Sequence, residues 1–557
     1  MKTILFLVAN VLLVSAGPTV QIAPGTVEGF DFVTSSGSTS EIFLGVPFAQ
    51  PPVGDLRFEK PAEILQFTDG YVNASAFGFS CHPHAKAAMP HPTSEDCLFM
   101  NIIKPKVVTE PLPVLVWIHG GGFEFGSTHN FGYKGFANVY NPKGVIVISI
   151  QYRVGIYGFL STGNNIIPGN LGLWDMTESL KFINKYISAF GGDPNQVTVW
   201  GLSAGGCAAG QLAISPFSRN FLQRTIQMSG SPFSSWGYGP TVPVGSWDVI
   251  ERVGCKDVAD VKACMKDASV EEIYDATAQS GWSTADLNTV KWGPVIDGEF
   301  MTDTADVMAK NITQKKPAYL GLGNKDGGFF TLMGMNPYLH QMELTNAQFQ
   351  SFSRQDLVNT IRRLIAKKFF PLNHEKVVKK LVDFYVDQGA NNSVGSGFYV
   401  DRYSLFLNDI FFTVPAVRES DFRSKNNFPT YVYSMDHYNG AIWKGRTVPD
   451  EAKGSVHTNE YPYMFEFFQL GLFDLFSDEE RPVTESIRDS IINFTKTGVP
   501  SITHTNFKQY GGSKQYLSIN PKPVVRNNFY KNAAKLWDDI SKMGFDIVTM
   551  IQLRQQY

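Results

Sequence analysis

Short apolar segments recur along the chain, each bounded by glycine, proline or a polar turn. Runs of this length and character are typical of strands that are buried on both faces of a sheet. They span residues 114–118, 145–150, 197–200 and 430–433. The stretch 175–190 instead carries its apolar residues at helical spacing. A strand, a crossover helix and a parallel strand form the basic unit of a doubly wound sheet, so the pattern predicts an α/β fold.

The chain carries no charge-run linker, no low-complexity segment and no repeat at solenoid periods. We therefore expect one large domain over residues 18–557, with a helical insertion near 346–391. Of its 557 residues 43% are hydrophobic and 18% charged, and the formal net charge is −3. This balance gives no basic footprint for nucleic acid and no polybasic attraction to a membrane. Charge alone identifies no partner and no oligomeric state.

The N-terminus has the pattern of a signal peptide. Lys2 precedes an apolar run over 4–14, and the small residues Ser15, Ala16 and Gly17 follow. The alternatives are a membrane anchor or a buried strand, but a bilayer span needs about 20 apolar residues. We expect a signal peptide over residues 1–17 and a mature chain in the secretory pathway or outside the cell. No other stretch is long enough to span a membrane.

Five cysteines fit an oxidising compartment. Cys81 and Cys97 flank one short loop, and Cys255 and Cys264 flank another. Two local bridges would leave Cys207 single, although counting alone permits other pairings. A secreted chain would also offer four acceptors for N-linked glycans. These are Asn73, Asn311, Asn391 and Asn493.

A candidate nucleophile follows directly on the strand predicted at 197–200. Residues 201–205 read G-L-S-A-G, and an alanine-rich helical stretch comes next. A serine on a sharp turn between strand and helix has a strained backbone, and the flanking glycines permit the close approach that this turn requires. The alternative is a structural serine in a tight turn. Because the motif sits between a buried strand and a helix of small residues, we predict that Ser203 is the nucleophile.

A glycine loop leaves the strand predicted at 114–118. It reads His119-Gly-Gly-Gly122, and consecutive glycines let backbone N–H groups point into a cavity without obstructing side chains. Such donors stabilise the oxyanion of a tetrahedral intermediate. We predict that the N–H groups of Gly121, Gly122 and Ala204 form this oxyanion hole. A merely flexible loop fits poorly at the end of a buried strand, and His119 is interpreted as structural.

With these motifs the chain resembles the carboxylesterase/cholinesterase family, the type-B carboxylesterases of the α/β-hydrolases. Further segments that match the family pattern are FLGVPFAQPPVG at 43–54, SEDCL at 94–98, NLGLWD at 170–175 and FGGDP at 190–194. The resemblance implies a large, mostly parallel central sheet flanked by helices with helical insertions. It also implies the disulfides Cys81–Cys97 and Cys255–Cys264, and an ion pair between Arg57 and Glu95 beneath the active site.

The family order of nucleophile, acid and base locates the other members of a catalytic triad. His457 falls at the position of the general base, although Thr458 stands where a glycine is usual. Asp326 falls at the position of the acid, where most relatives carry the longer Glu; the alternative is a solvated turn aspartate paired with Lys325. Two further residues match positions that support the triad from behind. They are Glu460 and Ser229.

The departures from the family pattern bear on the substrate. Cholinesterases carry a tryptophan for cation–π contact in their first disulfide loop, but here residues 82–96 contain no Trp, Tyr or Phe. Leu202 also replaces the glutamate that cholinesterases place beside the nucleophile. Acetylcholine is therefore disfavoured. We expect Trp236 and Phe329 to shape the substrate pocket, and the small residues Asn288 and Val290 to leave room for acyl groups larger than acetyl.

The predicted chemistry needs no metal and no cofactor. His82, His84 and His91 are close in sequence, but they fall in a proline-rich segment that we interpret as a solvated loop. The expected partner is a small-molecule carboxylic ester, uncharged and moderately hydrophobic. Two alternatives remain: a neutral lipase that acts at oil–water interfaces, and a non-catalytic adhesion or binding protein of the same fold. Chain-length preference distinguishes the first, and failure to react with an active-site phosphonate the second.

Overall fold

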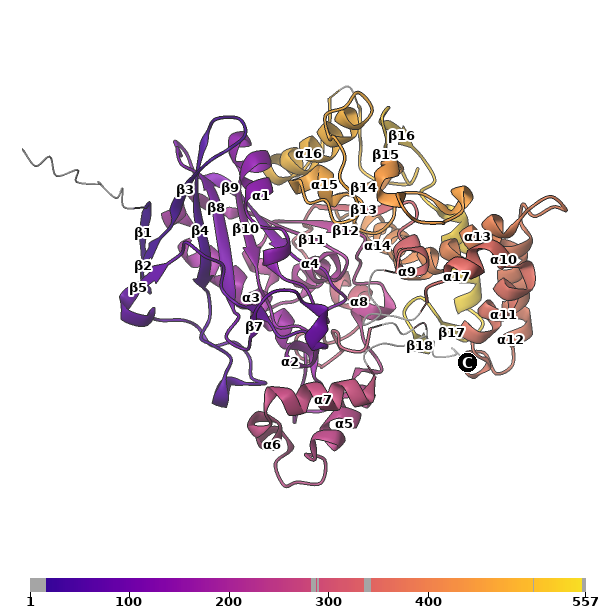
Figure 1. The fold of residues 1–557 in the computed structure, drawn as a ribbon, viewed down its shortest axis with the longest axis horizontal. Coiled ribbons are helices and arrows are strands. Elements are labelled where there is room, and N and C mark those ends of the chain that lie inside the picture. Colours follow the sequence, from indigo (N-terminus) through magenta and orange to yellow (C-terminus); the bar gives the residue numbers. More distant parts are fainter. Residues whose placement is uncertain (1–16, 282–286, 288–289, 335–341, 504, 553–557) are drawn as a thin grey trace, which may run out of the picture.

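The computed structural model describes residues 17–281, 287, 290–334, 342–503 and 505–552. Residues 1–16, which hold most of the expected signal peptide, lie outside this part of the chain. An 11-stranded sheet runs through the molecule (Figure 1). From one edge to the other its strands are β16 (Val524–Arg526), β15 (Tyr516–Ile519), β14 (Thr430–Met435), β13 (Ala318–Gly323), β12 (Arg224–Met228), β11 (Gly192–Leu202), β9 (Leu112–Ile118), β10 (Ile146–Ile150), β8 (Phe99–Pro105), β4 (Thr39–Pro47) and β3 (Phe30–Val33).

The centre of the sheet is parallel and its edges are antiparallel. All neighbours from β15 to β10 run parallel, whereas β16, β8, β4 and β3 pair antiparallel. The carboxyl ends of the parallel strands therefore all lie on the same side of the sheet, where α/β proteins place their ligands. All four predicted strands exist, as β9, β10, β11 and β14, and the predicted α/β-hydrolase class is confirmed.

Helices cover both faces because successive side chains of a strand point in opposite directions. Val114, Val116 and Ile118 of β9 belong to the core cluster that contains residues of α3 (Leu171–Tyr186) and α4 (Ala204–Ile214). Leu115 and Trp117 of the same strand belong to the cluster of α1 (Lys134–Tyr140) and α16 (Glu480–Thr497). A strand that is buried on both faces reads as a continuous apolar run, which is why β9 stood out in the sequence.

The predicted crossover helix differs slightly in its limits. It begins at Leu171 and ends at Tyr186, and the tail of the predicted stretch forms a separate 3₁₀ turn, Ile187–Phe190. A helical segment does interrupt the sheet between β13 and β14, at the side of the molecule opposite β1 to β4 (Figure 1). It extends well beyond the predicted limit of residue 391. Its α-helices are α9 (Gly328–Leu332), α10 (Asn346–Ser351), α11 (Arg354–Leu364), α12 (His374–Leu381), α13 (Ser396–Asn408) and α14 (Val414–Lys425), with π-helical turns at Val382–Asp387 and Asp409–Thr413.

Smaller elements complete the fold. The strands β1 (Thr19–Ile22), β2 (Gly25–Glu28) and β5 (Tyr71–Asn73) form a separate sheet, and α5 (Val242–Val253), α6 (Val261–Asp267) and α7 (Val270–Ser280) form a helical group at the lower end of Figure 1. Cys81 is joined to Cys97 and Cys255 to Cys264, while Cys207 is free and buried. No helix in the described part of the chain combines the length and apolar content that a membrane crossing requires.

Candidate active site

Ser203 occupies a strained turn between β11 and α4. Its φ of 60° and ψ of −126° are sparsely populated by residues other than glycine, a strain that costs on the order of 1–3 kcal/mol. The Ser203 N–H donates to the carbonyl oxygen of Met228 at 2.8 Å, which ties the turn to β12. A Cβ on Gly201 would lie 2.3 Å from the backbone of Gly205, and one on Gly205 would lie 2.1 Å from the carbonyl oxygen of Ile118. The two glycines of the motif are therefore required by close packing, and the strained serine lies between them.

The glycine loop passes directly over this turn. A Cβ on Gly120 would lie 3.0 Å from Cβ of Ser203, and Gly121 and Gly122 have φ values of 120° and 64°. Ala204 is the first residue of α4, so its N–H is one of the donors that a helix leaves free at its N-terminal end. None of the N–H groups of Gly121, Gly122 and Ala204 donates a hydrogen bond to another described residue. The structure thus brings three available donors to the side of Ser203, as an oxyanion hole requires.

His457 and Asp326 lie next to each other although 131 positions separate them. The distance from Nδ1 of His457 to Oδ1 of Asp326 is 3.5 Å, and the two residues are 3% and 0% exposed. The other oxygen of Asp326 accepts a hydrogen bond from the N–H of Gly323 at 3.2 Å. Lys325 pairs with Asp401 and is turned away from Asp326. The alternative of a solvated turn aspartate paired with Lys325 is therefore wrong.

A second buried carboxyl group, that of Glu460, interacts electrostatically with Asp326. Glu460 is fully buried, and its Oε1 accepts a hydrogen bond from the hydroxyl of Tyr433 at 3.4 Å. Burial, and next the charge of Asp326, raise the pKa of Glu460 to about 8. Ser229 has a φ of 45° and donates its N–H to the carbonyl oxygen of Gly321 at 2.7 Å. Neither the Ser229 hydroxyl nor Oε2 of Glu460 has a hydrogen-bond partner among the described residues.

Three phenylalanine rings surround the imidazole of His457. Ring centroids lie 4.9 Å away for Phe412, 5.5 Å for Phe330 and 5.7 Å for Phe329. Of these three rings only that of Phe329 was predicted from the sequence. Phe330 is its neighbour in the chain and could have been found with it, whereas Phe412 reaches the site from the π-helical turn Asp409–Thr413, for which no local signal exists.

Asn408, the residue before that turn, contacts the segment that follows the candidate acid Asp326. Asn408 accepts a hydrogen bond from the N–H of Gly327 at 2.9 Å, and its amide group donates to the hydroxyl of Thr413 at 2.8 Å. The turn that follows Asp326 is thereby tied to the π-helical segment.

Ser203 and His457 line one cavity of about 100 Å³ together with the glycine loop. Its other lining residues include the aromatic Phe125, Phe131, Phe329, Phe330, Tyr461 and Phe467 and the polar Ser127, Asn130, Thr458 and Gln469. Trp236 is not one of its lining residues. Its ring lies behind Phe412, at 6.4 Å, and its N–H donates to the carbonyl oxygen of Phe411 at 3.2 Å. Val290 is buried, and Asn288 lies outside the described residues.

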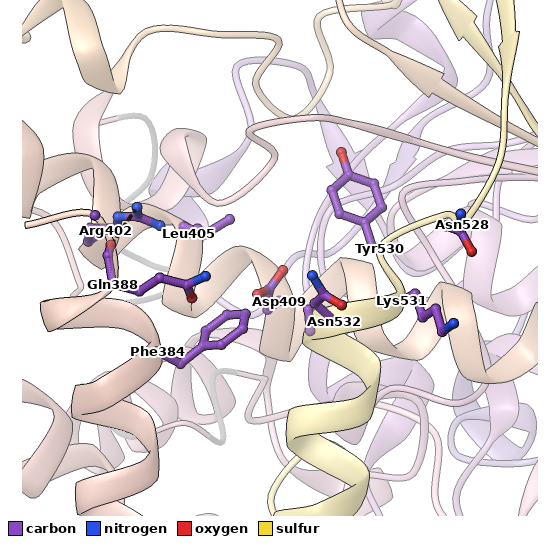
Figure 2. A pocket seen from close by; sticks show the side chains of 11 residues that line it. Phe384, Gln388, Arg402, Leu405, Asp409, Asn528, Tyr530, Lys531 and Asn532 are labelled. Atoms are coloured by element: carbon purple, nitrogen blue, oxygen red, sulfur yellow. Dashed lines mark hydrogen bonds between the residues drawn. The ribbon is translucent and has the colours of Figure 1, made fainter.

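A larger cavity of about 860 Å³ lies between the π-helical turn Val382–Asp387, α13 and the start of α17 (Lys531–Ser541). Figure 2 shows Phe384, Asp409 and Asn532 near its middle, with Arg402 toward one end and Lys531 toward the other. Burial raises the pKa of Asp409 to about 7. None of the predicted site residues lines this cavity, so the candidate chemistry belongs to the smaller one.

The remaining histidines have structural surroundings. His119 is buried against the ring of Tyr152 at 4.4 Å, and burial lowers its pKa to about 4. The prediction that His82, His84 and His91 occupy a solvated loop is wrong: His84 is fully buried, and the other two are half-buried because the loop packs against its neighbours. No group of three or more potential ligands is arranged to hold a metal ion within the described part of the chain.

Other predicted residues are placed as follows. Arg57 donates from Nε to Oε2 of Glu95 at 2.6 Å, in the predicted ion pair. Three of the glycan acceptors, Asn73, Asn311 and Asn391, are exposed. Asn493 is half-buried on α16, and its amide nitrogen donates to the carbonyl oxygen of Ser501 at 2.7 Å.

Comparison with known proteins relates the whole chain to ester hydrolases. A model described as the carboxylesterase family matches residues 16–537. The chain is 38% identical to gut esterase 1 of Caenorhabditis elegans, over 98% of this chain and 97% of that protein. It is 37% identical to gut esterase 1 of Caenorhabditis briggsae, over 96% and 94%. It is also 29% identical to an acetylcholinesterase of Bungarus fasciatus, over 90% of this chain and 82% of that protein.

Proposed function

Because the chain belongs to the carboxylesterase family and is a carboxylesterase, we propose that it hydrolyses uncharged, moderately hydrophobic carboxylic esters through an acyl-enzyme on Ser203. One observation supports the proposal: Ser203, His457, Gly121 and Gly122 line one small cavity, with Asp326 next to His457 and Ala204 next to Ser203.

In the proposed reaction the hydroxyl oxygen of Ser203 attacks the ester carbonyl carbon while His457 removes its proton. The carbonyl oxygen becomes an oxyanion, which the N–H groups of Gly121, Gly122 and Ala204 stabilise; one such donor contributes about 3–4 kcal/mol. His457 then returns the proton to the leaving alcohol, and an acyl-serine remains. Asp326 orients the imidazole and stabilises its charged form. Water, activated by His457 in the same way, releases the carboxylic acid and restores Ser203.

The walls of the cavity support a neutral, apolar substrate. Phe329 and Phe330 line it, Phe412 packs on His457, and Leu202 stands beside the nucleophile. A quaternary ammonium group gains most from a desolvated tryptophan face, by about 2 kcal/mol. The disulfide loop supplies no aromatic ring for this purpose. We propose that Trp236 limits the acyl pocket indirectly, through its contact with Phe412.

We further propose that the chain is secreted as one catalytic domain after removal of residues 1–17, and that its exposed sequons carry glycans. The two disulfides support this, since such bonds persist in oxidising compartments.

The test uses p-nitrophenyl esters from acetate to octanoate, and two thioesters that differ only in charge, acetylthiocholine and its 3,3-dimethylbutyl analogue. We expect a burst of p-nitrophenol equivalent to one acyl group per protein, and kcat/KM for the neutral thioester at least equal to that for the cation. A strong preference for acetylthiocholine would refute the substrate class. Folded protein that hydrolyses none of these esters would refute the activity and favour a binding protein.

A further inference from the structure

An apolar loop lies at the mouth of the candidate active site. Residues 466–479 join α15 (Tyr461–Phe465) to α16 and read E-F-F-Q-L-G-L-F-D-L-F-S-D-E. Leu472 is 79% exposed and Phe476 46% exposed. Four more apolar side chains of the loop are only half-buried. Of the seven large apolar residues in these fourteen positions, only Leu475 is buried, and exposed apolar surface of this kind marks a contact site.

The root of this loop is part of the site itself. Phe467 and Gln469 line the cavity that holds Ser203 and His457. The ring of Phe467 packs against Phe131, at 5.4 Å, and against Tyr461, at 5.7 Å, which line the same cavity. The exposed apolar surface is therefore continuous with the wall of the substrate cavity.

The loop is held in place with Leu472 facing outward. A Cβ on Gly471 would lie 2.6 Å from the carbonyl oxygen of Ala441, so the backbone is pressed against the 3₁₀ turn Gly440–Trp443. Phe476 lies under the guanidinium groups of Arg481 and Arg488, at 5.8 and 5.5 Å from its ring centroid.

The charges of the loop define what it can contact. It contains four carboxylates and no lysine or arginine. Glu466 pairs with Arg488, but Asp474, Asp478 and Glu479 form no salt bridge with any described residue. Arg481 and Arg488 adjoin Phe476, but the four carboxylates outnumber them, and this negative balance disfavours anionic lipid head groups. An apolar surface rimmed by carboxylates fits an uncharged lipid phase.

We propose that residues 466–479 seat the enzyme on aggregated neutral lipid esters, so that a substrate molecule passes from that phase into the adjoining cavity. The inference rests on the proposed ester hydrolysis and names its substrate class more narrowly: esters of low solubility, such as acylglycerols, presented at a surface. Leu472 is the principal contact, because it is the most exposed apolar side chain of a loop whose Phe467 and Gln469 line the cavity.

The test compares the intact chain with Leu472→Glu on two substrates, dissolved p-nitrophenyl butyrate and a tributyrin emulsion. Leu372→Glu is the matched control, since Leu372 is 92% exposed and belongs to the helical segment between β13 and β14, away from the cavity. We expect Leu472→Glu to lower the rate on the emulsion at least tenfold and to leave the rate on the dissolved ester within twofold. Leu372→Glu should change neither rate.

An unchanged rate on the emulsion would overturn the inference, as would an equal loss in both variants, which would reflect added charge alone. A lower molecular mass of Leu472→Glu in light scattering would also overturn it, because the loop would then contact a second copy of the chain. If the wild type hydrolyses no ester, the proposed function fails. The docking surface can still be tested by flotation of Ser203→Ala protein with triolein droplets. We expect Ser203→Ala protein to float with the droplets and the double variant Ser203→Ala, Leu472→Glu not to float.

Discussion

Two buried aspartates, Asp175 on α3 and Asp326 just after β13, have opposite surroundings. Asp175 accepts hydrogen bonds from Nε and Nη2 of Arg153, at 2.8 and 2.6 Å, and a third from the Arg153 backbone at 3.0 Å. Asp326 has one backbone donor at 3.2 Å and the imidazole of His457 at 3.5 Å. Both carboxylates are fully buried.

The comparison separates stability from chemistry. A buried carboxylate whose two oxygens are both paired, like that of Asp175, holds two segments together, whereas a buried carboxylate with fewer partners, like that of Asp326, can respond to a charge that develops on His457. Ser203, Ser229 and Thr458 of the site also have positive φ values. Variants in the site should therefore change turnover, and variants of the Arg153–Asp175 pair should change stability.

The largest expected effect is that of Ser203→Ala. The hydroxyl forms no hydrogen bond with any described residue, so its removal should lower kcat by about 10⁶ and leave the melting temperature unchanged. Steady-state kinetics and a thermal melt on the same sample check this. Retained turnover would show that another residue is the nucleophile.

Asp326→Asn should lower kcat by about 10⁴, the loss expected when a triad acid no longer orients its histidine. Glu460→Gln is the matched variant, because Glu460 is equally buried but is not paired with His457. Its effect on kcat should stay below about tenfold. The opposite ranking, measured as kcat/KM on one ester, would transfer the acid role to Glu460.

Asp175→Asn tests the other side of the comparison. It leaves the Arg153 guanidinium buried without its counter-charge, and we expect the free energy of unfolding to fall by about 3–5 kcal/mol. The kcat of the protein that remains folded should stay within twofold. Urea unfolding and active-site titration give the two values, and lost turnover without lost stability would contradict the division.

The last expected effect is a pH dependence of stability. Folding raises the pKa of Glu460 from 4.5 to about 8, so between these values the folded state binds more protons than the unfolded state. Stability from this group is therefore present below pH 4.5 and is lost as the pH rises toward 8, by at most about 5 kcal/mol. Unfolding of the wild type and Glu460→Gln at pH 5 and pH 8 measures it. Equal slopes in the two proteins would show that Glu460 is ionised throughout.

The sequence was sufficient for features that depend on local pattern. Both central strands next to the site, β9 and β11, are apolar on both faces and could therefore be predicted from their continuous apolar runs. Gly201 and Gly205 are required by close contacts at the turn. The edge strand β3 was not predicted, because its exposed and half-buried positions alternate and it lacks a continuous apolar run.

Features that depend on distant contacts could not be read in this way. Phe412 reaches His457 only because a π-helical turn follows α13, and the burial of His84 depends on the loop that contains Glu124, whose carbonyl oxygen accepts the His84 N–H at 2.9 Å. The pairing of Asp326 with His457 was available only through the family resemblance, since nothing local relates residues so far apart.

The central claim, that Ser203 is an activated nucleophile, is tested most directly by intact-mass analysis of the pure protein after reaction with a fluorophosphonate. We expect one adduct per chain, mapped by peptide digestion to Ser203 and absent from Ser203→Ala. A folded protein that gains no adduct, or gains it on another residue, would show that Ser203 is not an activated nucleophile.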